Sequence, residues 1–526
     1  MIEIHLKKNV FRHPIVACFF ITFLAFSCKE KPETKGKEVA QQTEVKKPNI
    51  VFILVDDLGY ADVGFNGSTY YETPNLDALA KESLVLDNAY MYPTCSPSRT
   101  AIFTGKQSFR TGVYTVPVLE KGTAEENIFS RWTVGKEHTI FAEPLADAGY
   151  KAIHIGKWHI VGPYPEKEKK MTFPIQQKLT QPDPGDYSWV AKHKTPEIHQ
   201  YYPEGRGFIK NVAGTYRGDP ALEPGGYKSV GGGYIAPFSN PFIEQKPTDE
   251  WLTDRLTDEA IEFIGDHKNE PFFINLDYYA VHAPVRKRNE ELYQKYLNKE
   301  VDSITGQGIA EKIKRKEHYA GYASMVESVD TNVARIVKYL DDNGLRENTM
   351  IILTSDNGYN GGQSKNDLLR GAKGYIYEGG IKVPALVNWP GKVQARRSKE
   401  AITALDFFPT FLDVAGIKNY NGELDGNSIT PMFTKDNEQF TNRPLFWHIA
   451  SQWKHGTCSV IRKNNYKLIQ FLADGKLELY NLNADPSEST NLVETNKDIA
   501  NTMLAELVQW RKQNKVPLPP NSVLEF

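Results

Sequence analysis

The sequence predicts an α/β protein: a large, mixed but mostly parallel sheet sandwiched by helices, with a smaller C-terminal α+β subdomain. Three observations support this prediction. The run from Asn49 to Val55 is continuously apolar after its first residue, which is typical of a strand buried on both faces of a parallel sheet. Helical patterns alternate with further runs of this kind. The composition is globular, with 40% hydrophobic, 24% charged and 12% aromatic residues.

The overall composition excludes several classes of protein. The chain has 526 residues and a formal net charge of −2, so it lacks the basic excess that would indicate nucleic-acid binding. It is too apolar for a mostly disordered chain, and it is neither a collagen nor a coiled coil. The one long apolar run, residues 15–26, is too short and too near the N-terminus to span a membrane in the mature protein.

The N-terminus has the features of a secretory signal. Positive residues precede the apolar run, and the run ends in Leu-Ala-Phe-Ser-Cys at Cys28. This ending resembles a bacterial lipobox, in which the cysteine becomes the lipidated first residue. We therefore predict a lipoprotein signal peptide over residues 1–27 and a lipid anchor at Cys28. An ordinary signal peptide with a chance cysteine is the alternative.

The next segment, residues 28–47, is rich in Lys, Glu, Thr and Gln, which is typical of a flexible tether. Lys29 and Glu30 follow the cysteine with no Asp at the first position. By resemblance to such lipoproteins, this favours sorting to the outer membrane. We expect a lipid-anchored protein of the bacterial cell envelope, on either its periplasmic or its cell-surface face.

The first half of the chain predicts an alternation of strands and helices. After the strand 49–55, Thr73 and Pro74 are an N-cap and a first-turn proline, opening a helix that runs to about Leu84. Residues 141–148 form a helix that stops at Gly149, and a strand follows over residues 151–155. Residues 163–250 are rich in Pro, Gly and Tyr and show little periodicity, which indicates a functional or disordered loop.

The second half continues the pattern and then changes. Apolar residues at helical spacing begin at Leu252, and a strand follows over residues 272–278. A long helix covers about residues 319–341 and leads to a strand over residues 350–354. The tail predicts antiparallel strands over 459–471 and 476–482 and a final helix over 499–510. We therefore divide the chain into a catalytic domain, residues 48–400, and a C-terminal subdomain, residues 401–526.

Acidic and amide residues follow two of the predicted strands. Asp56 and Asp57 end the first strand, and Asp356 and Asn357 end the strand 350–354. In an open α/β sheet, ligands bind outside the carboxyl ends of the strands. Three carboxylates and one amide oxygen are suitable ligands for a hard divalent cation, Ca²⁺ or Mg²⁺. Two unrelated turns are the alternative, because Asp and Asn are common turn residues.

The most specific motif is Cys-Ser-Pro-Ser-Arg at residues 95–99. Pro97 favours the first turn of a helix, which places Cys95 at a helix N-terminus, where anions are stabilised. With Thr104-Gly105 downstream, the string resembles the signature of the type I sulfatases, in the alkaline phosphatase superfamily. The resemblance implies that a separate maturase oxidises Cys95 to formylglycine and that Arg99 holds the modified residue.

Further motifs of this family follow in order over roughly residues 46–512 and imply the remaining site residues. By resemblance, Lys157 and His159 contact the formylglycine and the sulfate, and Lys373 binds the sulfate. The implied metal ligands are Asp56, Asp57, Asp356, Asn357 and the modified Cys95. The implied cation is Ca²⁺, with Mg²⁺ as the alternative. The supporting strings are Gly156-Lys157-Trp158-His159, His282-Ala283-Pro284, Ser355-Asp356-Asn357-Gly358, Leu369-Arg370-Gly371-Ala372-Lys373 and Glu378-Gly379-Gly380.

The resemblance also implies a mechanism. The formylglycine hydrates and one of its hydroxyls attacks the sulfate sulfur, while the cation and two lysines, Lys157 and Lys373, neutralise the developing charge. His282 or Lys373 protonates the leaving alcohol, and His159 takes the proton that allows sulfate to leave. Taken singly, each histidine has a commoner fate in the core or a loop, and each lysine a commoner fate at the surface.

The sequence departs from the family pattern at two points. Lys382 stands where the family usually has Arg, and we interpret it as a packing position or a contact behind the site. One residue is added after His159, within Ile160-Val161-Gly162, so the path of this loop is open. Because Cys95 has a catalytic use, we expect no disulfide with Cys458.

A carbohydrate sulfate ester is the expected substrate. A tethered envelope protein is well placed to process polysaccharides, and aromatic rings in the loop 163–250 can stack on sugars. Arg206 and Arg217 are candidates for binding a uronate or a second sulfate, or are merely solvated. Which sugar is used and whether the action is exo or endo stay open. The aromatic residues are Tyr164, Tyr187, Trp189, Tyr201, Tyr202, Tyr216, Tyr227 and Tyr234.

Two other functions compete with the sulfatase prediction. A phosphonate monoester or phosphodiester hydrolase would share the superfamily, the fold and the cation site. A non-catalytic lipoprotein that binds sulfated glycans would keep Cys95 unmodified. The complete set of candidate catalytic residues argues against the second alternative.

Overall fold

The computed structural model describes residues 46–179, 195–220, 233–238, 240–246, 249–300, 315–361 and 368–524. The predicted signal peptide, the lipid anchor at Cys28 and nearly all of the tether lie outside these residues. In this part of the chain, no helix combines the length and the apolar character needed to cross a bilayer.

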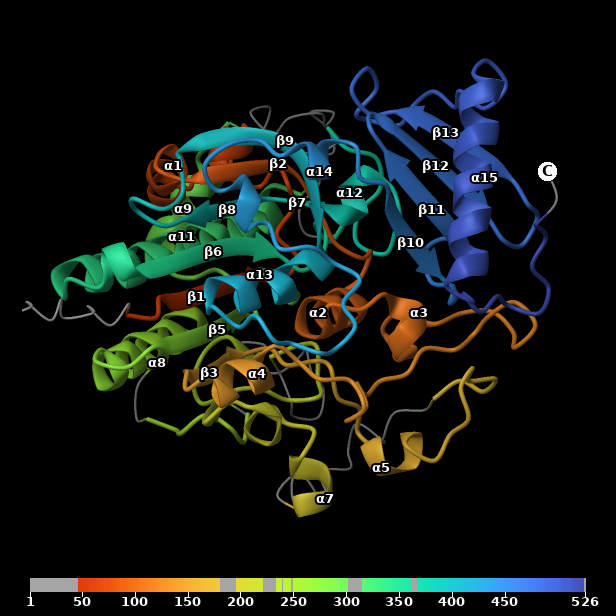
Figure 1. Cartoon of the computed structure of the whole chain (residues 1–526). Helices are drawn as coiled ribbons and strands as arrows, with labels where there is room; N and C mark the ends of the chain where they lie inside the picture. Colours follow the sequence, from red (N-terminus) through yellow and green to blue (C-terminus); the bar gives the residue numbers. More distant parts are fainter. Residues whose placement is uncertain are drawn as a thin grey trace, which may run out of the picture. The chain divides into compact units, whose positions relative to one another are not determined.

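Within the described residues, nine strands form one mixed sheet (Figure 1). Their order is β4-β3-β5-β1-β6-β8-β2-β7, and β9 also pairs with β2. The strands from β4 to β6 in this order run parallel, whereas β8 is antiparallel to β6 and to β2. The prediction of a large, mostly parallel sheet is confirmed. The strands are β1 (Asn49–Val55), β2 (Leu84–Tyr90), β3 (Lys151–Gly156), β4 (Lys210–Val212), β5 (Phe272–Tyr278), β6 (Thr349–Ser355), β7 (Lys382–Val383), β8 (Ala385–Asn388) and β9 (Arg396–Thr403).

Helices cover both faces of this sheet. Strand β1 is fully buried, and alternate residues such as Phe52 and Ile53 face two separate cores. Helices α1, α8, α9 and α11 pack in one core, and α2, α4 and α13 in the other. The helices are α1 (Pro74–Lys81), α2 (Cys95–Thr104), α3 (Ser108–Thr111), α4 (Ala142–Asp147), α5 (Pro165–Glu168), α7 (Pro196–His199), α8 (Leu252–His267), α9 (Glu290–Leu297), α11 (Lys316–Asp342), α12 (Glu378–Ile381), α13 (Phe407–Val414), α14 (Glu438–Thr441) and α15 (Lys497–Gln513).

A separate antiparallel sheet follows near the C-terminus, and α15 lies along one of its faces (Figure 1). This confirms the predicted α+β character of the tail. The predicted boundary at residue 400 lies within β9, which pairs with β2 of the larger sheet. The division into two domains stays a prediction. The strands are β10 (Leu445–Ile449), β11 (Cys458–Lys463), β12 (Tyr466–Phe471) and β13 (Leu477–Asn481).

Two predicted elements differ from the structure. The helix predicted to reach Leu84 ends at Lys81, because Ser83 Oγ bonds back to the Leu79 carbonyl at 2.6 Å and Leu84 begins β2. The predicted strand segment 459–471 is a hairpin of β11 and β12, which turns at Asn464 with a left-handed φ of 52°. Strands β2, β4, β7, β8, β9 and β10 were not predicted.

Candidate active site

Two pairs of predicted metal ligands meet at the carboxyl edge of the larger sheet. Strands β1 and β6 are parallel neighbours, so the residues that follow each strand lie side by side. The Asp57 amide donates to Asp356 Oδ1 at 3.3 Å, and Asn357 Nδ2 donates to Asp57 Oδ1 at 2.7 Å. These three side chains and that of Asp56 are fully buried. The structure therefore brings the predicted ligands together.

The residues of this cluster fit a hard divalent cation. Asp56 Oδ1, Asp57 Oδ2 and Asn357 Oδ1 are buried and have no hydrogen-bond partner among the described residues. Buried oxygens without partners are costly, and a bound cation would satisfy them. His282 also belongs here, since ligand atoms of Asp56, Asp57 and His282 lie within 4.8 Å of one another.

Cys95 begins helix α2 and lies against His159. The Cys95 Sγ atom is 3.3 Å from His159 Nδ1, and the two residues are only 2% and 5% exposed. His159 has a left-handed φ of 54°. A Cβ on Gly218 would lie 2.6 Å from the His159 ring, so only glycine allows this approach. The predicted helix N-terminus at Cys95 is confirmed.

Arg99 lies one turn after Cys95 and holds two carboxylates. Its Nε donates to Asp356 Oδ2 and its Nη1 to Asp277 Oδ2, both at 2.9 Å, with all three side chains fully buried. Asp277 was not among the predicted site residues, although an acidic residue within the apolar run 272–278 was a usable signal. The role of Arg99 toward a modified Cys95 stays a prediction.

Two buried lysines neutralise the aspartates after β1. Lys157 Nζ lies 2.5 Å from Asp56 Oδ2, and Lys373 Nζ lies 2.7 Å from Asp57 Oδ1. The alternative of solvated surface lysines is therefore wrong. Lys157 reaches its position because Gly156, at a φ of 100°, turns the chain at the end of β3. A Cβ on Gly156 would lie 1.8 Å from the Asp277 carbonyl oxygen.

The electrostatic environment lowers the pKa values of His159 and His282 and raises that of Lys373. Burial, with help from Lys373, lowers the pKa of His282 to about 3, although Asp57 opposes this. Burial and Lys157 hold the pKa of His159 well below its usual range. For Lys373, burial lowers the pKa, but Asp57 and the other acidic groups outweigh it and the net shift is upward. These shifts favour the neutral form of both imidazoles and the protonated form of Lys373.

The reactive residues open into a small cavity of about 130 Å³. Arg217 and Asp219 line it beside the catalytic candidates, and they form an ion pair at 3.3 Å. Asp219 lay in a loop without periodicity, so no sequence signal pointed to it. The lining residues are Cys95, Val116, Val118, Leu119, Trp132, His159, Tyr216, Arg217, Gly218, Asp219, His282 and Lys373.

Most of the described aromatic residues of the loop 163–250 are packed rather than exposed. Tyr202 stacks on Phe242, and Tyr234 stacks on Trp251. Arg206 is buried beside Glu143 and the His138 carbonyl, so it does not face the cavity. Tyr216 is the predicted ring that lines the cavity. Tyr187, Trp189 and Tyr227 lie outside the described residues.

The fold and the site together define a hydrolase of the alkaline phosphatase-like superfamily. Residues 48–417 match the sulfatase family, and residues 372–513 match the C-terminal region of N-sulphoglucosamine sulphohydrolase. The first match covers well over half of the chain. The chain therefore belongs to the sulfatase family, and it is a sulfuric ester hydrolase.

Individual relatives agree with this assignment. A sulfatase of Formosa agariphila is 29% identical over 525 residues, covering 90% of each chain. N-acetylgalactosamine-6-sulfatase of Mus musculus is 30% identical over 413 residues, covering 76% of this chain and 68% of its own. The crystal structure of Ps i-CgsB in complex with k-i-k-neocarrahexaose is 28% identical, has a TM-score of 0.67, and covers 91% of this chain and 95% of its own.

Proposed function

We propose that the protein hydrolyses sulfate esters on a sulfated polysaccharide or oligosaccharide. The observation that carries this proposal is the cavity into which Cys95, His159, His282 and Lys373 converge above the buried Asp and Asn cluster. The carbohydrate class is supported by the named relatives, which include an N-acetylgalactosamine-6-sulfatase and a structure bound to a neocarrahexaose.

The proposal includes oxidation of Cys95 to formylglycine. The sequence string at residues 95–99 and the place of Cys95 in the cavity support it. Burial raises the pKa of the unmodified thiol, although Lys157 and Lys373 oppose this, so a reactive thiolate is disfavoured. The modified residue, once hydrated, would supply the hydroxyl nucleophile.

The proposal also includes a divalent cation, Ca²⁺ in preference to Mg²⁺. Asp56, Asp57, Asp356 and Asn357 would hold it, together with the modified Cys95. The unpartnered oxygens of three of these residues support this assignment. The cation would act as a Lewis acid toward the sulfate group.

The remaining roles belong to cationic and imidazole side chains. Lys157 and Lys373 neutralise charge on the sulfate oxygens as the ester bond breaks. His159 accepts a proton through Nδ1, the ring nitrogen that faces residue 95. Lys373, 2.7 Å from Asp57, or His282, 3.8 Å from it, donates the proton to the leaving alcohol, and the directions of the two pKa shifts favour the lysine as the protonated group.

The test is sulfate release from a panel of sulfated saccharides by protein coexpressed with a maturase. Free sulfate is measured by ion chromatography, with a phosphodiester and a Cys95→Ala variant alongside. We expect release from at least one saccharide and none from the variant, whose circular dichroism should match the parent. Release by the variant would contradict the formylglycine mechanism. Preferred turnover of the phosphodiester would support the competing hydrolase.

Three further measurements address the modification, the cation and the location. A mass spectrum of the Cys95 peptide should show formylglycine, and unmodified cysteine in protein from the native host would favour the glycan-binding alternative. Treatment with EDTA should abolish sulfate release, and Ca²⁺ should restore it more fully than Mg²⁺. Fractionated outer membranes should contain the protein with a lipidated Cys28, and a soluble form without lipid would contradict the anchor.

A further inference from the structure

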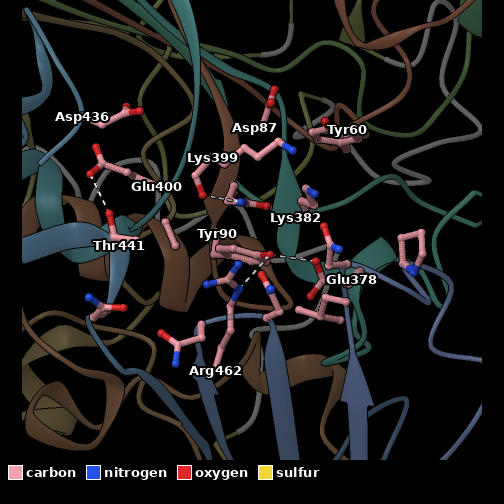
Figure 2. Close-up of a pocket in the computed structure, with 18 residues that line it drawn as sticks. Tyr60, Asp87, Tyr90, Glu378, Lys382, Lys399, Glu400, Asp436, Thr441 and Arg462 are labelled. Carbon is pink, nitrogen blue, oxygen red and sulfur yellow. Dashed lines mark hydrogen bonds between the residues drawn. The ribbon is translucent and has the colours of Figure 1, made fainter. Parts of the chain in front are cut away.

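A pocket of about 600 Å³ lies apart from the catalytic cavity and shares no lining residue with it (Figure 2). One wall comes from β2 and β9 of the larger sheet. The opposite wall comes from the turn between β11 and β12 and from residues 482–486. Its volume lies within the range of about 300–1,000 Å³ that is usual for ligand sites. The pocket is therefore large enough for a saccharide segment.

Three cations line this pocket without an acidic partner. Lys382, Lys399 and Arg462 form no ion pair with any residue in the described part of the chain. Arg462 uses its Nε to donate to Tyr90 at 3.2 Å (Figure 2), which leaves its terminal nitrogens for another acceptor. Such a guanidinium suits a sulfate or carboxylate group.

The four carboxylates of the same pocket are only partly neutralised by groups outside its lining. Asp87 and Asp436 each pair with an arginine, whereas Glu378 shares Lys467 with Glu488, and Glu400 accepts only from neutral donors. With these partners counted, six cations stand against five carboxylates, so an incoming anion would meet a surplus of one positive charge. The existing partners are Arg397 for Asp87, Arg396 for Asp436, Lys467 and Tyr90 for Glu378, and Thr441 with the Asn437 amide for Glu400.

Lys382 is the position at which the sequence departs from the family pattern. Its ammonium lies 4.6 Å from the centre of the Tyr60 ring. Burial lowers the pKa of Lys382, although Glu378 opposes this, so the ammonium lacks the polar partners that water would supply. The ammonium lies over the Tyr60 ring as a cation–π partner, and its positive charge suits the acidic substituent of a sugar.

Neutral polar groups complete the rim. The side-chain amides of Asn442, Asn464, Asn465 and Asn483 line the pocket and are exposed. Each amide offers both donors and an acceptor, which suits sugar hydroxyl groups. The lining thus combines anion-binding and hydroxyl-binding groups.

We propose that this pocket is a second, non-catalytic binding site for a sulfated saccharide segment. The sulfate group lies against Lys382 and Arg462, and the sugar hydroxyl groups meet the asparagine amides of the rim. The identity of this ligand rests on the proposed substrate class. The site would hold one part of a polymer while the catalytic cavity receives another part.

The test is hydrogen–deuterium exchange on the full mature chain carrying Cys95→Ala, which prevents turnover. The probes are k-i-k-neocarrahexaose, a chondroitin sulfate hexasaccharide and an unsulfated agarohexaose. We expect a sulfated probe to slow exchange in the segment 462–466, and the unsulfated probe to leave it unchanged. Lys382→Met or the exposed Lys399→Gln should weaken this protection about tenfold in half-saturating concentration. The matched control is Lys392→Met, an exposed lysine outside the pocket.

The results separate this inference from the proposed function. Unchanged exchange at residues 462–466 with every sulfated probe would overturn the second site, whatever the protein hydrolyses. Equal protection in Lys382→Met, Lys399→Gln and the control would overturn it as well. Protection that depends on the pocket lysines would support the second site even if the unmutated protein released no sulfate.

Discussion

Arg99 joins two carboxylates that come from different parts of the sheet, and all three side chains are fully buried. Asp277 is in β5 and Asp356 follows β6, yet both accept from the same guanidinium at 2.9 Å. Removing one partner of a buried ion pair leaves the other charge uncompensated. The position of Asp356, a predicted metal ligand, therefore depends on Asp277.

Asp277→Ala tests this dependence. We expect the free energy of unfolding to fall by about 3–5 kcal/mol, since the change strips Arg99 of one buried partner. Asp277→Asn keeps an acceptor and should lose less. Urea denaturation measures both variants, and Asp342→Ala, at an exposed surface pair with Lys338, is the control that should change little. Equal stability of Asp277→Ala and the control would contradict this account.

At the residue scale, site residues could be predicted from the sequence where they belong to a short catalytic motif. Cys95, Lys157, His159 and Lys373 all line or adjoin one buried site. Asp219 was not predictable, because only the folded loop brings it to the cavity. The burial of single aromatic rings was not predictable either, because it depends on partners distant in the sequence.

Some strands and helices were easier to predict from the sequence than others. Strands β1, β5 and β6 are central and buried on both faces, so their apolar runs marked them. Strand β2 contains Asp87 and Asn88, and its first leucine also continues the helical spacing of α1. The competing helical pattern therefore hid the strand. The end of β3 shows how one glycine at an element boundary can position a catalytic candidate.

Gly156→Ala tests the end of β3. The added Cβ would overlap the Asp277 carbonyl at 1.8 Å, so the backbone that carries Lys157 must shift. Gly149→Ala is a matched control, because its φ of 87° is similar but its Cβ would meet no atom within 4 Å. We expect the control to cost about 1 kcal/mol and Gly156→Ala clearly more. Sulfate release should fall at least tenfold only in Gly156→Ala. Similar losses in both variants would show that backbone conformation alone accounts for the effect.

At the scale of the whole molecule, the alternation of helices and strands predicted the class of fold but not the order of strands. That β8, β2 and β9 extend the sheet beyond β6 follows from long-range pairing that no local pattern encodes. Contacts between distant segments also fix the protonation of buried groups. His448 in β10 contacts Ser459 of β11 and Pro517 near the C-terminus. The environment of its imidazole therefore forms only when these separate segments have folded together.

His448 makes stability depend on pH. Its Nε2 lies 2.9 Å from the Pro517 carbonyl, which only accepts, so Nε2 carries the proton and Nδ1 accepts from Ser459. Burial lowers the pKa of His448 to about 3, although the Pro517 carbonyl opposes this. The pKa of an unfolded histidine is about 6.5. Between these two values the unfolded chain binds one more proton than the folded chain, so acid favours unfolding.

The contribution of His448 should therefore be full above pH 6.5 and should diminish as the pH falls toward 3. The loss is about 1.4 kcal/mol for each pH unit in this window. His448→Gln keeps a donor toward Pro517 but cannot be protonated, so its free energy of unfolding should fall less steeply between pH 7.5 and 4.5. Urea denaturation at several pH values measures the slopes, with His199→Gln as a control that removes a half-exposed imidazole. Parallel slopes for the unmutated chain and His448→Gln would show that folding does not lower the pKa of His448.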